Sequence, residues 1–129
     1  MPEDSGQDSP EERANRILDE ILLANRWQRP SLIMAVYRSE HVKEKVQNQI
    51  TLSLESNGLS VLAYNVHRSH YDIPRELLEH SHHEKTIYAV HGLRWGGGRG
   101  YSNAYRALNM HREYLVQGSI KAIFWLTVS

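Results

Sequence analysis

Four short apolar segments alternate with amphipathic segments along most of this chain, and this alternation constrains the fold more than any other feature. The apolar segments are 32–37 (LIMAVY), 59–66 (LSVLAYNV), 86–91 (TIYAVH) and 120–128 (IKAIFWLTV). Between them lie predicted helices over 40–57, 73–80 and 102–117, where apolar residues recur at helical spacing. Strands that alternate with helices form right-handed βαβ units. We therefore predict a three-layer α/β sandwich with a four-stranded, mostly parallel sheet, either P-loop-like or flavodoxin-like.

A further helix is predicted before the first strand. Ser9 is suited to cap it, Pro10 fits the first helical position, and Glu12 completes a capping box. Pro30 disfavours its continuation. The predicted organisation is a disordered polar tail over 1–8, an N-terminal helix over 9–28 and an α/β domain over 30–129. That domain is either covered beside its last strand by the first helix or forms part of a longer protein.

Charge and composition exclude several classes of protein. The chain has 15 basic and 15 acidic residues among 129, and such a balance is not typical of proteins that bind nucleic acid or membrane surfaces. It has no cysteine, which excludes disulfides, thiolate zinc sites and cysteine nucleophiles. It shows neither a signal-peptide pattern nor an apolar run of about 18 residues. We therefore expect a cytoplasmic protein.

A glycine cluster follows the third apolar segment and precedes a predicted helix. Strand, glycine loop and helix together present backbone N–H groups to an anion at the helix N-terminus, on the sheet edge where ligands of α/β proteins bind. The predicted site for an anion or a nucleotide, such as ATP, consists of Gly96, Gly97, Gly98, Arg99, Ser102 and Asn103. Glycines in such numbers are also typical of a long surface turn.

Histidines suggest a second kind of site. His67, His70 and Asp72 follow the second apolar segment, and His91 ends the third. Two histidines and a carboxylate are a common set of metal ligands. The alternative interpretation is that they are exposed loop residues.

The first predicted loop lacks the residues that a nucleotide-hydrolysing site needs. Arg38, Ser39, Glu40 and His41 stand where a P-loop would have glycines and a lysine followed by Ser or Thr. Ser39 is predicted to cap the following helix and Glu40 to interact with its dipole. A GxSxG motif is also absent from the sequence, so we predict no catalytic residue.

Three pieces of the chain, AVHGLRW (89–95), ALNMHREYLVQ (107–117) and IKAIFWLT (120–127), together suggest a family. The chain resembles the N-terminal nucleotide-binding-like α/β domain of bacterial STAND-type signalling ATPases, which are often fused to repeats. The resemblance implies an AAA-like or P-loop-like fold and a role in ligand-gated signalling. It transfers no catalytic residue, because both the Walker A motif and an acidic Walker B pair after the third strand are missing.

Three functions follow as hypotheses. The first is a degenerate nucleotide-binding-like module that acts in signalling or assembly through a protein partner or self-association. The second is a small metal-assisted hydrolase that uses His67, His70, Asp72 and His91. The third is a purely structural interaction domain, whose fourth strand would lie at an open sheet edge and pair with another chain.

Overall fold

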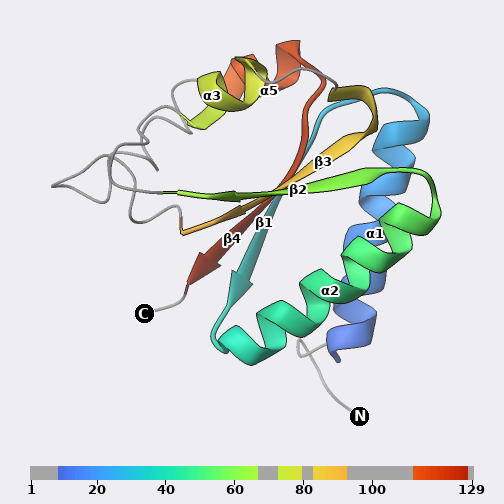
Figure 1. Ribbon diagram of the computed structural model, residues 1–129, viewed down its shortest axis with the longest axis vertical. Helices are drawn as coiled ribbons and strands as arrows, with labels where there is room; N and C mark the ends of the chain where they lie inside the picture. The colour runs from blue at the N-terminus through green and yellow to red at the C-terminus, as the bar shows by residue number, and fades with distance from the viewer. Residues whose placement is uncertain (1–8, 67–72, 80–82, 93–111, 128–129) are drawn as a thin grey trace, which may run out of the picture.

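The computed structural model describes residues 9–66, 73–79, 83–92 and 112–127. They form a four-stranded, all-parallel sheet with helices on both faces, which confirms the predicted α/β fold (Figure 1). The elements in chain order are α1 (Pro10–Arg26), β1 (Ser31–Tyr37), α2 (Glu40–Ser56), β2 (Ser60–Asn65), α3 (Ile73–Glu79), η1 (His83–Lys85), β3 (Thr86–His91), α5 (Arg112–Gln117) and β4 (Lys121–Thr127).

The order of the strands across the sheet is β1-β4-β3-β2. The expectation that the fourth strand lies at an open edge is therefore wrong, because β4 pairs with β1 on one side and with β3 on the other. The edge strands are β1 and β2. In flavodoxin-like sheets the first strand lies between the second and the third, so this order is a different one.

Among the described elements, one pair of helices covers each face of the sheet. Helices α1 and α2 pack together on one face, and α3 and α5 pack on the other (Figure 1). Side chains of a strand point alternately to its two faces, so β3 contributes Ile87 to the first core and Tyr88 to the second. In β4, Trp125 likewise joins the first core and Phe124 the second. These central strands are buried on both faces, as their continuous apolar runs predict.

The helix ends follow the predicted local chemistry at three points. Ser9 and Glu12 form the reciprocal capping box of α1. The Ser39 hydroxyl accepts a hydrogen bond from the Val42 N–H and caps α2. Gly58 follows α2 with a φ of 79°, a left-handed conformation that glycine adopts without a steric penalty.

Gly118 has a different function from the helix stop that its position suggests. The positive φ after α5, 51°, belongs to Ser119. A Cβ atom on Gly118 would lie 2.7 Å from Leu78 Cδ1. Gly118 therefore leaves room for Leu78 where α3 and α5 approach, and a larger residue there would displace that side chain.

The element boundaries differ from the predicted ones by one or two residues. Helix α1 ends at Arg26 and is followed by a turn in which the Arg29 N–H donates to the Ala24 carbonyl. The predicted tail over 1–8 and the predicted start of the last helix at Ser102 lie outside the described residues. Within the described part of the chain, no helix has the length and apolar character needed to cross a membrane.

Candidate functional site

The connections that follow β1 and β3 lead to helices on opposite faces of the sheet. The chain leaves β1 for α2 on the α1 face, whereas α5, the next described helix after β3, lies on the α3 face. Strand β4 lies between β1 and β3. In open α/β sheets, ligands bind beyond the carboxyl ends of the strands where the connections diverge in this way. The end of the sheet that carries Tyr37 and His91 is therefore the candidate site.

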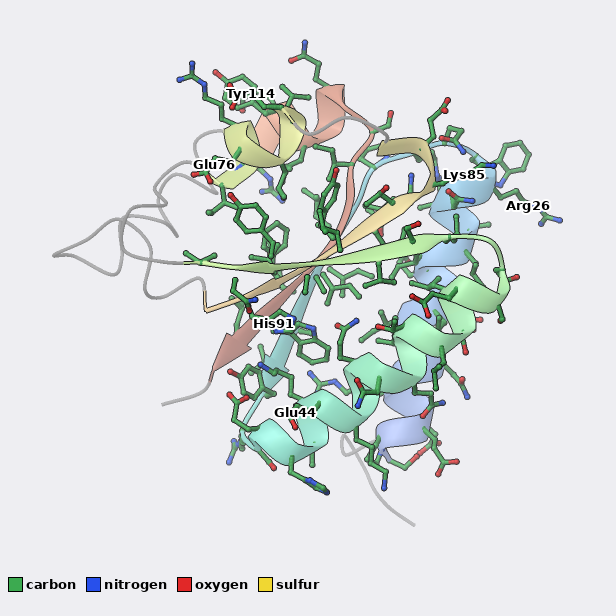
Figure 2. The ribbon with its side chains drawn as sticks, in the orientation of Figure 1. Arg26, Glu44, Glu76, Lys85, His91 and Tyr114 are labelled. Carbon is green, nitrogen blue, oxygen red and sulfur yellow. The ribbon has the colours of Figure 1, made fainter. Side chains whose placement is uncertain are left out.

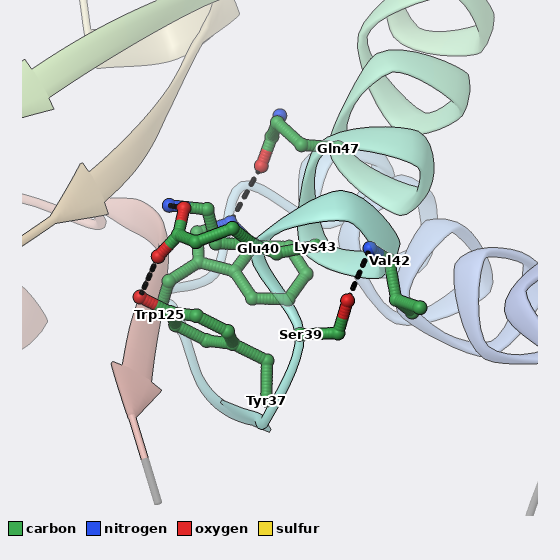
Figure 3. Close-up of polar contacts among 7 residues, drawn as sticks. All are labelled: Tyr37, Ser39, Glu40, Val42, Lys43, Gln47 and Trp125. Atoms are coloured by element: carbon green, nitrogen blue, oxygen red, sulfur yellow. Dashed lines mark hydrogen bonds and ion pairs between the residues drawn. The ribbon is translucent and has the colours of Figure 1, made fainter.

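A compact polar cluster occupies this end beside β1 (Figure 3). The Tyr37 hydroxyl donates a hydrogen bond of 2.8 Å to Glu40 Oε2, and Lys43 Nζ lies 3.2 Å from Glu40 Oε1. The Lys43 ammonium also lies 4.9 Å from the centroid of the Tyr37 ring, a cation–π arrangement. The cluster forms because Glu40 and Lys43 are one helical turn apart and Tyr37 ends the strand that precedes them.

The Glu40 carboxylate disfavours the binding of a phosphate at the start of α2. The hydrogen bond from Tyr37 and then the contact with Lys43 lower the pKa of Glu40, so the carboxyl is ionised at neutral pH. It lies in the first turn of α2, where the helix dipole favours a negative charge. The connection from β1 consists only of Arg38 and Ser39, too short for a phosphate-binding loop. An internal anion thus stands where a P-loop protein would hold its ligand's phosphate.

Two aromatic side chains hold α2 on the sheet next to this cluster. The buried Trp125 indole donates a hydrogen bond of 2.7 Å from Nε1 to Gln47 Oε1 (Figure 3). The ring of Trp125 meets that of Tyr37 edge to face, with 6.1 Å between the centroids, and the Arg13 guanidinium lies 5.9 Å from its centroid. These contacts set the position of Lys43 and Gln47 relative to β4.

His91 ends β3 on the face that α2 covers (Figure 2). Burial and then the nearby Lys43 charge lower its pKa, while Glu40 acts in the opposite direction. Its usual pKa is 6.5, so the imidazole is neutral at pH 7. A neutral imidazole offers one hydrogen-bond donor and one acceptor.

A cleft of about 490 Å³ opens beside this histidine, between α2 and the carboxyl ends of β2 and β3. Such a volume lies within the range of small-molecule sites. The residues that line it are Lys43, Glu44, Gln47, Asn48, Ala63, Asn65 and His91. Sequence reasoning missed Asn48 and Asn65. The sequence feature that could have identified Asn48 is its position one helical turn beyond Glu44. For Asn65 it is the position at the end of a strand.

The structure tests little of the predicted sites directly. The anion-site residues Gly96, Gly97, Gly98, Arg99, Ser102 and Asn103 lie outside the described residues. Of the predicted metal ligands, His91 is described, whereas His67, His70 and Asp72 are not. Among the described residues, no three His, Asp or Glu side chains form a group that could hold a metal ion. What the structure adds is the position of His91, which lines the cleft and lies near the charges of Lys43 and Glu40.

Comparison with protein-family models, with curated proteins and with solved structures finds no match to this chain.

Proposed function

We propose that this chain is a nucleotide-binding-like module without hydrolytic activity, and that a nucleotide binds in the cleft at the carboxyl ends of β2 and β3. The observation that carries the proposal is the cleft of about 490 Å³ beside His91, at the carboxyl ends of two parallel strands. In this proposal the module acts in signalling or assembly, as its resemblance to STAND-type domains implies.

The lining of the cleft suits the base and sugar of a nucleotide better than its phosphates. Lys43 is paired with Glu40, and Glu44 adds a further negative charge, so the cleft itself has no excess positive charge. Asn48, Asn65 and His91 supply both donors and acceptors. Groups of this kind give specificity for heterocycles and hydroxyls through paired hydrogen bonds.

The phosphates have candidate partners in the segment that follows β3. The chain leaves β3 through His91 and Gly92, whose φ of 72° is a conformation that favours glycine. The sequence from 85 to 112 contains no acidic residue and includes Arg94 and Arg99. Arginine pairs with phosphate through two parallel hydrogen bonds. We therefore assign the phosphates to Arg99 and the glycines before it, and the base and sugar to the cleft.

Hydrolysis has no support in the described residues around β1. The loop of Arg38 and Ser39 offers no lysine or glycine to a phosphate, and Glu40 would repel one. The metal-assisted hydrolase with His67, His70, Asp72 and His91 remains a prediction from sequence, and the same experiment tests it through a zinc arm.

The test is thermal unfolding of the chain with ATP, ADP, GTP or inorganic phosphate, each with and without magnesium, and with zinc alone. A nucleotide at about 100 times its dissociation constant adds roughly 2.7 kcal/mol to the free energy of unfolding. We expect a nucleotide to stabilise the chain more than phosphate does. A panel in which no nucleotide stabilises a cooperatively folded chain would overturn the proposal, and stabilisation by zinc alone would favour the hydrolase.

Two variants with matched controls locate the site. Asn65→Ala removes a cleft amide, and Ser60→Ala changes an exposed residue at the opposite end of β2. Arg99→Ala removes the proposed phosphate partner, and Arg75→Ala removes an exposed arginine on α3. We expect at least a tenfold loss of affinity in N65A and R99A and wild-type affinity in the controls. Unchanged binding in N65A would refute the cleft, and unchanged binding in R99A would refute the phosphate assignment.

A further inference from the structure

The outer edge of β1 carries backbone groups that no strand of the described chain pairs with. The Ser31 N–H donates to the Ile120 carbonyl, which shows that the N–H and C=O groups of Ser31, and of every second residue after it, face β4. The groups of Leu32, Met34 and Val36 therefore face away from the sheet, because these directions alternate along a strand. One of them, the Val36 carbonyl, accepts a hydrogen bond from the Arg13 guanidinium.

A groove of about 440 Å³ runs between this edge and α1. Arg13, Arg16, Ile17 and Glu20 line it from the helix, and Leu32, Ile33, Met34 and Ala35 line it from the strand. On the opposite face of β1, the Met34 and Val36 side chains are 43% and 46% exposed. An open, apolar edge strand of this kind is a template for pairing with another strand.

We propose that a second copy of this chain pairs with this edge, antiparallel, so that the two copies form one continuous eight-stranded sheet. The twofold axis passes beside Met34, which lies opposite Met34 of the second copy. This interface goes beyond the proposed ligand site, which lies at the carboxyl ends of β2 and β3.

The outward-facing groups of β1 are self-complementary about Met34. In antiparallel pairing, Met34 exchanges two hydrogen bonds with its counterpart, and Leu32 exchanges two with Val36 of the second copy. The Val36 carbonyl has two lone pairs, so it accepts this bond together with the one from Arg13. Opposite residues lie on the same face, so the exposed Met34 and Val36 side chains of the two copies join into one apolar stripe.

Two of the three charged residues that line the groove from α1, Arg13 and Glu20, complement one another across the same axis. Arg13 reaches the Val36 carbonyl near the end of β1, so α1 runs antiparallel to the strand. At about 1.5 Å per helical residue and 3.3 Å per strand residue, Ile17 lies near the level of Met34 and Glu20 near that of Ile33. The twofold axis places Ile33 opposite Ala35 of the second copy, one residue from the level of Arg13. Glu20 therefore lies within side-chain reach of Arg13 of the second copy, and the pair forms twice. Arg16, near the level of the axis, lies one helical turn from Glu20 of its own helix.

Cysteine cross-linking tests both the interface and its register, since the chain has no cysteine of its own. Opposite residues of such a pair have Cα atoms about 5.5 Å apart, within the range of a disulfide. Under mild oxidation we expect M34C to form a covalent dimer. V36C is the matched control, because it is equally exposed but lies about 14 Å from its counterpart, four residues along the strand. Equal cross-linking of V36C would overturn the register.

Light scattering over a concentration series tests the association without a cross-link. We expect the wild-type chain to approach twice its mass of 15.0 kDa as concentration rises. M34K places two like charges opposite each other across the interface and should remain monomeric. The control is L62K on β2, the other edge strand, where Leu62 is 39% exposed. It should dimerise as the wild type does. A wild-type chain that stays monomeric throughout overturns the proposal and leaves this edge to a foreign strand. Equal dimerisation of M34K also overturns it.

Discussion

Replacing Gln47 with methionine tests whether the hydrogen bond to Trp125 holds α2 in place. Methionine has nearly the size of glutamine but cannot accept the indole N–H. Trp125 is 2% exposed, so its N–H would remain buried without a partner, at a cost of about 1–3 kcal/mol. In a chain of 129 residues, each kcal/mol changes the melting temperature by about 4 °C. We therefore expect Gln47→Met to melt about 4–12 °C below the wild type.

The assay is urea and thermal unfolding followed by far-ultraviolet circular dichroism, with Thr51→Val as the control. Gln47 Nε2 also donates a hydrogen bond of 3.1 Å to Thr51 Oγ1, and T51V removes that bond alone. Thr51 is half-buried. Gln47 is 9% exposed but lines the cleft, where water can reach its amide, so we expect T51V to cost about 0.5 kcal/mol. A Gln47→Met chain as stable as T51V would refute the reasoning, because the buried indole would then need no acceptor.

Two further predictions concern the pH dependence of stability and the packing of α3 against α5. Burial and Lys43 lower the pKa of His91 in the folded chain, so the unfolded chain takes up this proton first as pH falls below about 6.5. His91→Gln should therefore lose less stability than the wild type between pH 7.5 and 5.5 in urea titrations; parallel losses would show that His91 does not contribute. Gly118→Ala places a Cβ against Leu78 and should cost about 1–3 kcal/mol. Leu78→Ala, added to Gly118→Ala, should recover part of that loss. A Cβ at Gly58 would meet no neighbour within 4 Å, so Leu78→Ala, added to Gly58→Ala, should recover none.

The α/β fold could be predicted because its signals are local. The apolar run of β3 appears over the residues that the periodicity predicts, and the Ser9 and Ser39 caps form with partners three residues away. Contacts between residues that are close in sequence depend little on how distant segments pack, and this is why local sequence patterns predict them.

The candidate site could be predicted only in part. The sequence places Glu40 and His91 at strand ends, and the structure brings both to the same edge of the sheet. The sequence does not indicate that Glu40 accepts a hydrogen bond from Tyr37, or that Asn48 and Asn65 line one cleft. These contacts depend on the direction in which α2 crosses the sheet.

The sequence by itself determined the four strands, the helices α1, α2 and α3, the caps at Ser9 and Ser39 and the absence of a P-loop after β1, because each depends on residues that are close along the chain; it did not predict η1. Only the tertiary structure decided the order of the strands, which places β4 inside the sheet and leaves β1 at its edge. That order depends on which apolar surfaces pack across β1 and β4, about 90 residues apart in sequence. Local patterns carry no information about such pairings, and both the cleft and the open edge of β1 result from them.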